Sequence, residues 1–150
     1  MIDTTLKTLY ETDFALWIAE TLSSLRSKDM ANIDFENLIE EVEALGISQR
    51  KSLESFLVRL FEHLLKRCYV ALPDCYRNWE IEIRNFRREL KRELKYSPSL
   101  KRFMLEIWDE AYQEALEAVK NDYPKALFPD LCPFSLEIET LLSKNFWDLN

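Results

Sequence analysis

The sequence predicts an all-α protein, and three observations favour that fold class. The 150-residue chain contains a single glycine, whereas hairpins and open sheets usually need several glycines for turns with positive φ. Every long segment places its apolar residues at helical spacing, without the alternation of a half-buried strand. Hydrophobic residues make up 47% of the chain, and a chain of this length can bury a core without a disulfide or metal. We therefore expect one domain, residues 1–150, folded as an antiparallel bundle of four main helices with an extended proline-rich segment and a short C-terminal helix.

The first helix is predicted over residues 12–27, "TDFALWIAETLSSLRS", with Thr12 or Asp13 as its N-cap. Its apolar side chains fall on one face, which we expect to be buried in the bundle: Phe14, Trp17, Ile18, Leu22 and Leu25.

The second helix begins near Asp34, and its apolar row continues to Cys68. Gly46 lies on this row and allows two interpretations. It can be the glycine that ends one helix, or a small residue inside a single helix of roughly 36 residues, about 54 Å long. Because the row keeps its phase across Gly46, we favour one continuous or kinked helix.

The third helix is predicted over residues 78–95, with Asn78 as its N-cap, after a connection around Pro73. A fourth helix follows the boundary "YSPSL", with Ser97 as a cap and Pro98 at the first helical position. The core residues that we expect from these two helices include Trp79 and Trp108.

The remaining chain, "NDYPKALFPDLCPF", contains three prolines and predicts an extended segment packed on the bundle. Ser135 is the expected cap of a short last helix. The aromatic and apolar side chains expected to hold this segment in place are Phe128, Leu131, Phe134 and Trp147.

Taken in order, these segments resemble a bacterial family common in cyanobacteria, the domain of unknown function 29. The resemblance rests on "LYETDFALWIAET", "DFENLIEEVEALGISQRKSLESFL", "FEHLLK", "NWEIEIRNFRREL", "SPSLK" and "FPDLCPFSLEIETLLSKNFW". It implies a helical, stand-alone domain and carries no assigned activity. The chain departs from the family pattern after "HLLK", where "RCYVALPDCYRN" replaces an aromatic residue and a "YQP"-like turn.

Composition and charge rank several functions low. A net charge of −7 opposes a primary role in binding nucleic acid or an anionic membrane. We expect no membrane span, because no apolar run approaches the roughly 18–20 residues that a span needs. The N-terminal stretch does not have the order of a signal peptide. The three cysteines lack the close pairing of zinc motifs, so we expect a cytoplasmic protein with reduced cysteines and no cofactor.

His63, the only histidine, lies in "LFEHLLK" near the boundary of the apolar row. Metal sites in helical bundles place carboxylates three or four residues from a histidine, but Arg59, Leu60, Lys66 and Arg67 occupy those positions here. We favour a structural role. Glu40 and Glu43, one helical turn apart in "EEVE", could supply carboxylates to His63 from another helix. An enzyme or metal-binding protein using His63 with Glu40 or Glu43 therefore stays open, although a solvated acidic face is the simpler interpretation.

The basic stretch between residues 77 and 102 is the most distinctive charge feature. Its cations recur at helical spacing opposite the apolar seam, and the residues predicted to bind a partner are Arg84, Arg87, Arg88, Lys91, Arg92 and Lys95. Acidic residues on the next helix could instead neutralise them within the chain. We expect a small interaction or scaffold protein without catalysis, which binds an unknown protein partner and can form a homodimer. Nucleic-acid binding through residues 84–95 is a further alternative.

Overall fold

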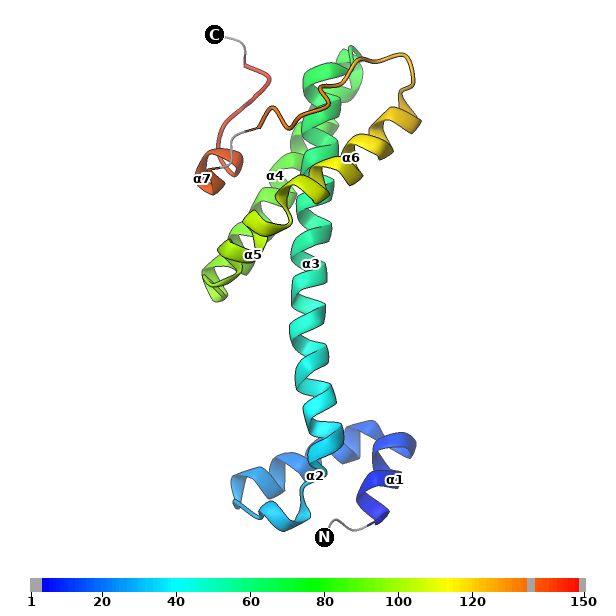
Figure 1. The fold of residues 1–150 in the computed structure, drawn as a ribbon, viewed down its shortest axis with the longest axis vertical. Coiled ribbons are helices and arrows are strands. Elements are labelled where there is room, and N and C mark those ends of the chain that lie inside the picture. The colour runs from blue at the N-terminus through cyan, green and yellow to red at the C-terminus, as the bar shows by residue number, and fades with distance from the viewer. Residues whose placement is uncertain (1–3, 135–136, 149–150) are drawn as a thin grey trace. The chain divides into compact units, whose positions relative to one another are not determined.

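The computed structural model describes residues 4–134 and 137–148, and every regular element in these ranges is a helix. The helices are α1 (Thr4–Thr12), α2 (Phe14–Arg26), the 3₁₀ turn η1 (Met30–Asn32), α3 (Phe35–Tyr69), α4 (Pro73–Tyr96), α5 (Leu100–Glu106), α6 (Trp108–Asp122) and α7 (Ile138–Leu141) (Figure 1). The all-α class is confirmed. The finer arrangement, an antiparallel bundle of four main helices, stays a prediction.

The chain forms two compact units, unit 1 (Met1–Ser48) and unit 2 (Gln49–Asn150). Helix α3 contributes its first part to unit 1 and its second part to unit 2. The expectation of one domain over the whole chain stays a prediction.

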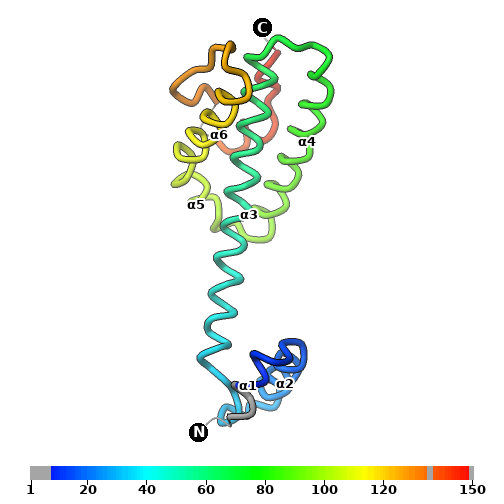
Figure 2. The backbone as a smooth tube through the Cα atoms, turned by 90° about the vertical axis from the view of Figure 1, so that its right-hand side faces the viewer, coloured from blue at the N-terminus to red at the C-terminus, as the bar shows by residue number. Residues whose placement is uncertain are grey.

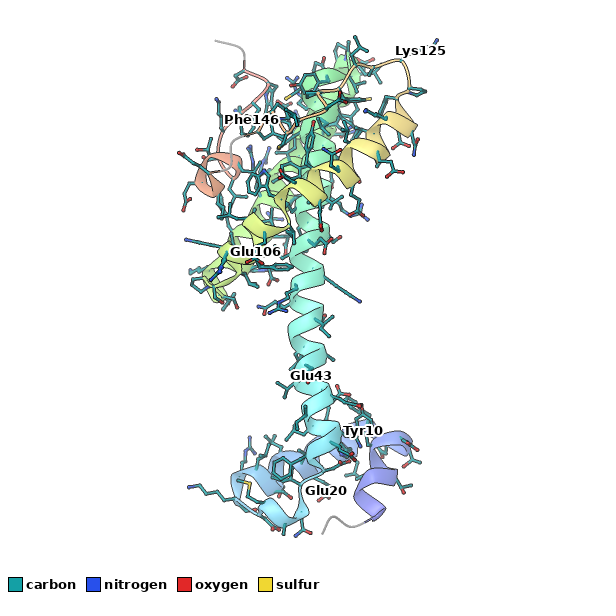
Figure 3. All side chains as sticks on the ribbon, viewed as in Figure 1. Tyr10, Glu20, Glu43, Glu106, Lys125 and Phe146 are labelled. Atoms are coloured by element: carbon teal, nitrogen blue, oxygen red, sulfur yellow. The ribbon has the colours of Figure 1, made fainter. Side chains whose placement is uncertain are left out.

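Unit 1 has a small core around Trp17 and Ile33, which are almost completely buried. The Tyr10 ring contacts the Trp17 ring edge-on, with their centroids 4.9 Å apart. Its hydroxyl donates a hydrogen bond of 2.5 Å to Glu41 Oε1 on α3, and Figure 3 shows the Tyr10 side chain beside that helix. These contacts join α1, α2 and the start of α3.

The first predicted helix is confirmed as α2, but the preceding helix α1 was not predicted, and the chain breaks between the two at Asp13. The break is a capping site: Asp13 has an extended φ of −149°, and its side chain accepts a hydrogen bond from the backbone N–H of Leu16. Asp13 is therefore confirmed as the N-cap.

The apolar rows of α2 and of the first part of α3 are largely exposed. Most of their members have more than a third of their surface exposed: Phe14, Ile18, Leu22, Leu25, Phe35, Ile39, Val42 and Leu45. The expected burial of the first predicted helix is therefore confirmed for Trp17 and wrong for the other members of its face. Helical periodicity identifies an apolar face without showing what covers it.

Helix α3 is continuous through Gly46, which has no positive φ. A Cβ atom at this position would meet no atom within 4 Å, other than the backbone of the helix itself. The favoured interpretation of one long helix is confirmed.

In unit 2, the second part of α3 lies between α4 and the α5–α6 pair (Figure 2). The three helical segments and the C-terminal residues share one hydrophobic core, and Phe61 of α3 lies at its centre against Trp108 and Tyr112 of α6. Trp79 and Trp108 are both buried, as predicted.

Three helix boundaries in unit 2 differ from the prediction, one of them the start of α5 at Leu100 rather than at Pro98. Helix α4 begins at Pro73 rather than at Asn78, because proline suits the first turn, where its missing N–H has no partner to lose. The predicted fourth helix is two helices, broken at Ile107. Ser97 ends α4 instead of capping the next helix, and its hydroxyl accepts a hydrogen bond of 2.9 Å from Gln49 Nε2.

Backbone and aromatic contacts hold the C-terminal segment on unit 2. Tyr112 donates its hydroxyl to the Pro129 carbonyl at 2.5 Å. Phe134 is buried between Phe61 and Phe146. The expectation for Leu131 is wrong, because 83% of this residue is exposed. The predicted cap Ser135 lies outside the described residues.

Arg67 attaches the end of the same segment. Its guanidinium carbon lies 3.8 Å from the centre of the Tyr76 ring and 5.3 Å from that of Trp147. Its Nε is 3.6 Å from Glu80 Oε1. The Trp147 indole therefore rests against a cation that α3 supplies.

Candidate cationic docking groove

A groove of about 820 Å³ runs between α4 and the C-terminal residues of unit 2. Leu142, Ser143, Asn145 and Trp147 line it on the C-terminal side. The cations that line it all come from α4: Arg77, Arg84, Arg87, Arg88 and Lys91.

Helical spacing explains why these cations gather. Arg84, Arg88 and Lys91 are separated by four and three residues, and Arg77 precedes Arg84 by two turns, so all four lie along one side of the helix. From Arg77 to Lys91 the row is roughly 21 Å long at 1.5 Å per residue. The four side chains are exposed, which makes the row accessible to a ligand.

The structure separates the six predicted partner-binding residues. Arg84, Arg88 and Lys91 line the groove with exposed side chains. Arg92 pairs with Glu89 one turn earlier on α4. Lys95 lines a smaller neighbouring pocket, together with Lys91.

Arg87 has a different environment from its neighbours, because it is only 8% exposed. Its Nε donates to the Leu141 carbonyl at 3.0 Å, and its Nη2 donates to the Lys144 carbonyl. Burial lowers the pKa of the Arg87 guanidinium. Arg87 therefore fixes the C-terminal wall of the groove and is not available to a partner.

The predicted basic stretch included Arg77, but the predicted partner-binding residues included neither Arg77 nor the C-terminal lining residues. Arg77 lies two turns before Arg84, so the same spacing would have included it if α4 had been predicted from Pro73. No sequence pattern predicts that Asn145 and Trp147 lie beside α4, because tertiary packing and not helical spacing places them there.

The predicted neutralisation of α4 by acids on the next helix is not seen, since no ion pair joins α4 to α6 within the described ranges. Lys120 pairs with Asp130 at 3.4 Å, and Arg102 with Glu106 at the same distance. In the described part of the chain, Arg77, Arg84, Arg88 and Lys91 have no acidic partner within ion-pair distance. Glu80 also lines the groove, but it pairs with Arg67, so the groove has a surplus of positive charge.

His63 lies on α3, and its ring stands 5.2 Å from that of Phe86, centre to centre. Its Nδ1 is 2.8 Å from the Arg59 carbonyl oxygen. Because a carbonyl oxygen only accepts hydrogen bonds, the imidazole must carry a proton on Nδ1 to make this contact. Burial, with smaller contributions from the nearby charges of Lys66 and Arg59, lowers the pKa of His63 despite the opposing hydrogen bond.

Glu40 and Glu43 are exposed residues of unit 1, whereas His63 belongs to unit 2. Within residues 4–134 and 137–148, no three His, Cys, Asp or Glu side chains form a group that could hold a metal ion. All three cysteines are unpaired, and burial raises the pKa of the Cys68 thiol to about 11.

None of the described helices combines the length and the apolar character that crossing a bilayer requires.

Comparison with known proteins identifies the family. No curated protein and no solved structure matches the chain. The family described as "Domain of unknown function DUF29" matches residues 9–147, nearly the whole chain. The protein therefore belongs to the DUF29 family.

Proposed function

We propose that the protein is a cytoplasmic interaction module without catalysis of its own, and that the cationic groove is its docking surface for an acidic segment of a partner protein. The single observation that carries this proposal is the row of exposed cations, Arg77, Arg84, Arg88 and Lys91, without acidic partners in the described chain. Three unpaired cysteines agree with a reducing compartment.

The groove offers more than charge. Leu142 is buried at its wall, Trp147 is half-buried at the same side, and both line the space beside the cations. Exposed ion pairs contribute only about 0–1 kcal/mol each, so apolar contacts of this kind are needed for useful affinity. Arginine also presents a planar fork that matches a carboxylate with two hydrogen bonds.

An acidic protein segment suits this surface better than nucleic acid does. The chain carries a net charge of −7, and long-range repulsion of a polyanion opposes association. A short acidic segment needs to neutralise only the local row. Nucleic-acid binding is the competing outcome of the test below.

The test compares a triple variant, Arg84→Ala, Arg88→Ala and Lys91→Ala, with a control variant, Lys51→Ala, Arg59→Ala and Lys120→Ala. The control removes the same charge from exposed residues that do not line the groove. The probes are a fluorescent twelve-residue peptide of glutamate, leucine and glycine, and a single-stranded oligonucleotide of equal charge. We measure fluorescence anisotropy across a salt titration, and helical circular dichroism verifies the fold.

We expect the acidic peptide to bind the parent chain and the control, and to bind the groove variant at least tenfold more weakly. Absence of peptide binding, or equal weakening in both variants, would remove the groove as the docking surface. Groove-dependent binding of the oligonucleotide in preference to the peptide, with a steep salt slope, would favour nucleic acid instead.

A further inference from the structure

The first part of α3 presents an apolar row on the surface of unit 1. Phe35, Ile39 and Val42 follow one another at helical spacing, and Leu45 continues the row with 72% of its surface exposed. From Phe35 to Leu45 the row is about 15 Å long, nearly three helical turns. An exposed apolar surface of this continuity marks an interaction site more often than a single exposed leucine does.

An acidic row lies directly beside the apolar one, because a glutamate follows each of its first three members. The pairs are Phe35–Glu36, Ile39–Glu40 and Val42–Glu43. One residue turns an α-helix by 100°, so the three glutamates form a parallel row along one edge of the apolar row. All three are exposed, and Figure 3 shows Glu43 on the side of the helix in unit 1.

The opposite edge of the apolar row faces α1. Glu41 lies one residue before Val42, so it is turned 100° the other way, and it accepts the hydrogen bond from Tyr10. Helix α1 therefore covers the edge away from the acidic row. The apolar row stays exposed on the surface of unit 1, with Glu40 and Glu43 exposed beside it.

The net charge of unit 1 indicates which kind of partner can bind this face. Residues 1–48 contain three lysines or arginines and ten aspartates or glutamates, a net charge of −7, whereas residues 49–150 contain seventeen of each kind and are neutral. No lysine or arginine occurs between Lys28 and Arg50. A second copy of unit 1 would bring two strongly negative surfaces together, and like charges oppose such pairing.

We propose that this face of α3 binds a basic amphipathic helix of a partner protein. The partner's apolar residues, at i, i+4 and i+7, would pack on Phe35, Ile39 and Val42, which is the mode of a helix laid on an apolar surface. Lysine or arginine on one edge of that helix would lie opposite Glu40 and Glu43. This surface differs in position and in sign of charge from the cationic groove of unit 2, and it does not depend on the function proposed for that groove.

The probe is an eighteen-residue synthetic helix of leucine and lysine with leucine at i, i+4 and i+7. A peptide of the same composition in scrambled order carries the same charge without an apolar face. Binding to the full chain is measured by anisotropy, and light scattering after size exclusion gives the mass of the free protein.

Two matched isoleucines test the position of the surface. Ile39 is 55% exposed within the row, whereas Ile47 is 51% exposed and lies about 80° away from Ile39 around the helix, outside the row. We expect Ile39→Ser to weaken binding of the ordered peptide at least tenfold and Ile47→Ser to change it less than twofold. The double variant Glu40→Gln, Glu43→Gln should weaken it several-fold and reduce its dependence on salt.

Several results would overturn the proposal. Equal binding of the scrambled peptide would show attraction by charge alone, and equal effects of the two isoleucine variants would show that the row is not the contact. Absence of binding would reject the surface. A dimer of the free protein that dissociates in the Ile39→Ser variant would show that a second copy covers the face instead. The groove variant Arg84→Ala, Arg88→Ala, Lys91→Ala should bind the ordered peptide normally, which separates this outcome from that of the proposed function.

Discussion

Replacing Arg87 by alanine should detach the C-terminal segment of unit 2. The buried guanidinium donates hydrogen bonds to the carbonyls of Leu141 and Lys144, and a hydrogen bond to a charged group contributes about 1.5–3 kcal/mol. Two such bonds amount to roughly 3–6 kcal/mol, but removing the charge also relieves the cost of burying it. We therefore expect Arg87→Ala to lower the free energy of unfolding by about 2–4 kcal/mol.

The assay is equilibrium unfolding in urea, followed by far-ultraviolet circular dichroism. With a denaturant slope of about 1–3 kcal/mol per molar urea for a small domain, the midpoint should fall by about 1–2 M. Limited proteolysis should cleave the variant first between residues 123 and 148, because that segment loses its attachment to α4. The variant Arg87→Met, which keeps most of the aliphatic stem, separates lost hydrogen bonds from lost packing.

The neighbouring Arg88 supplies a matched control on the same helix. It is exposed, and within the described residues its Nη2 donates to Asn85 Oδ1, at 3.3 Å. Arg88→Ala should change stability by less than about 0.5 kcal/mol. If Arg87→Ala and Arg88→Ala prove equally stable, the buried guanidinium does not hold the C-terminal segment.

Three further predictions concern α2, α3 and the histidine. Asp13→Ala should destabilise the protein by about 0.5–2 kcal/mol in urea unfolding because α2 loses its N-cap, whereas Asp13→Asn should retain most of the stability; equal losses would contradict a capping role. Gly46→Ala should raise stability by about 0.5–1 kcal/mol in thermal unfolding, since glycine is costly inside a helix and the added Cβ meets no neighbour; a loss would indicate a close contact at that position. The pKa of His63 is lowered in the folded chain, so the unfolded chain binds its proton first as the pH falls, and stability should decrease from about pH 6.5 downward. Proton NMR of this single histidine should give a titration midpoint below about 6.5, and a higher midpoint would show a carboxylate partner instead.

The sequence predicted the elements whose signal is local. The apolar row that stays in phase across Gly46 predicts one long helix, and the row through Trp79 predicts the buried face of α4. The start of α4 at Pro73 was also readable, since a proline followed by an acidic residue is typical of a first helical turn. The break at Ile107 has no such signal, because no glycine or proline accompanies it.

Properties that depend on distant contacts could not be predicted in the same way. Arg84, Arg87 and Arg88 are equivalent in charge and propensity, and only the fold brings backbone carbonyls from 54 and 57 residues later to Arg87 alone. The open apolar row of α3 has the same periodicity as a buried row. The candidate groove was therefore found as a stripe on one helix, without its second wall.

That second wall is a short stretch of chain near the C-terminus, so the groove exists only while this stretch is docked. A ligand that contacts both α4 and Trp147 must, by linkage, stabilise the docked state of the C-terminal stretch. A change that weakens docking of this stretch must lower the affinity for the ligand by the same factor. Because the Trp147 indole rests against Arg67, the difference in fluorescence between the parent chain, with its four tryptophans, and a Trp147→Phe variant would report that equilibrium.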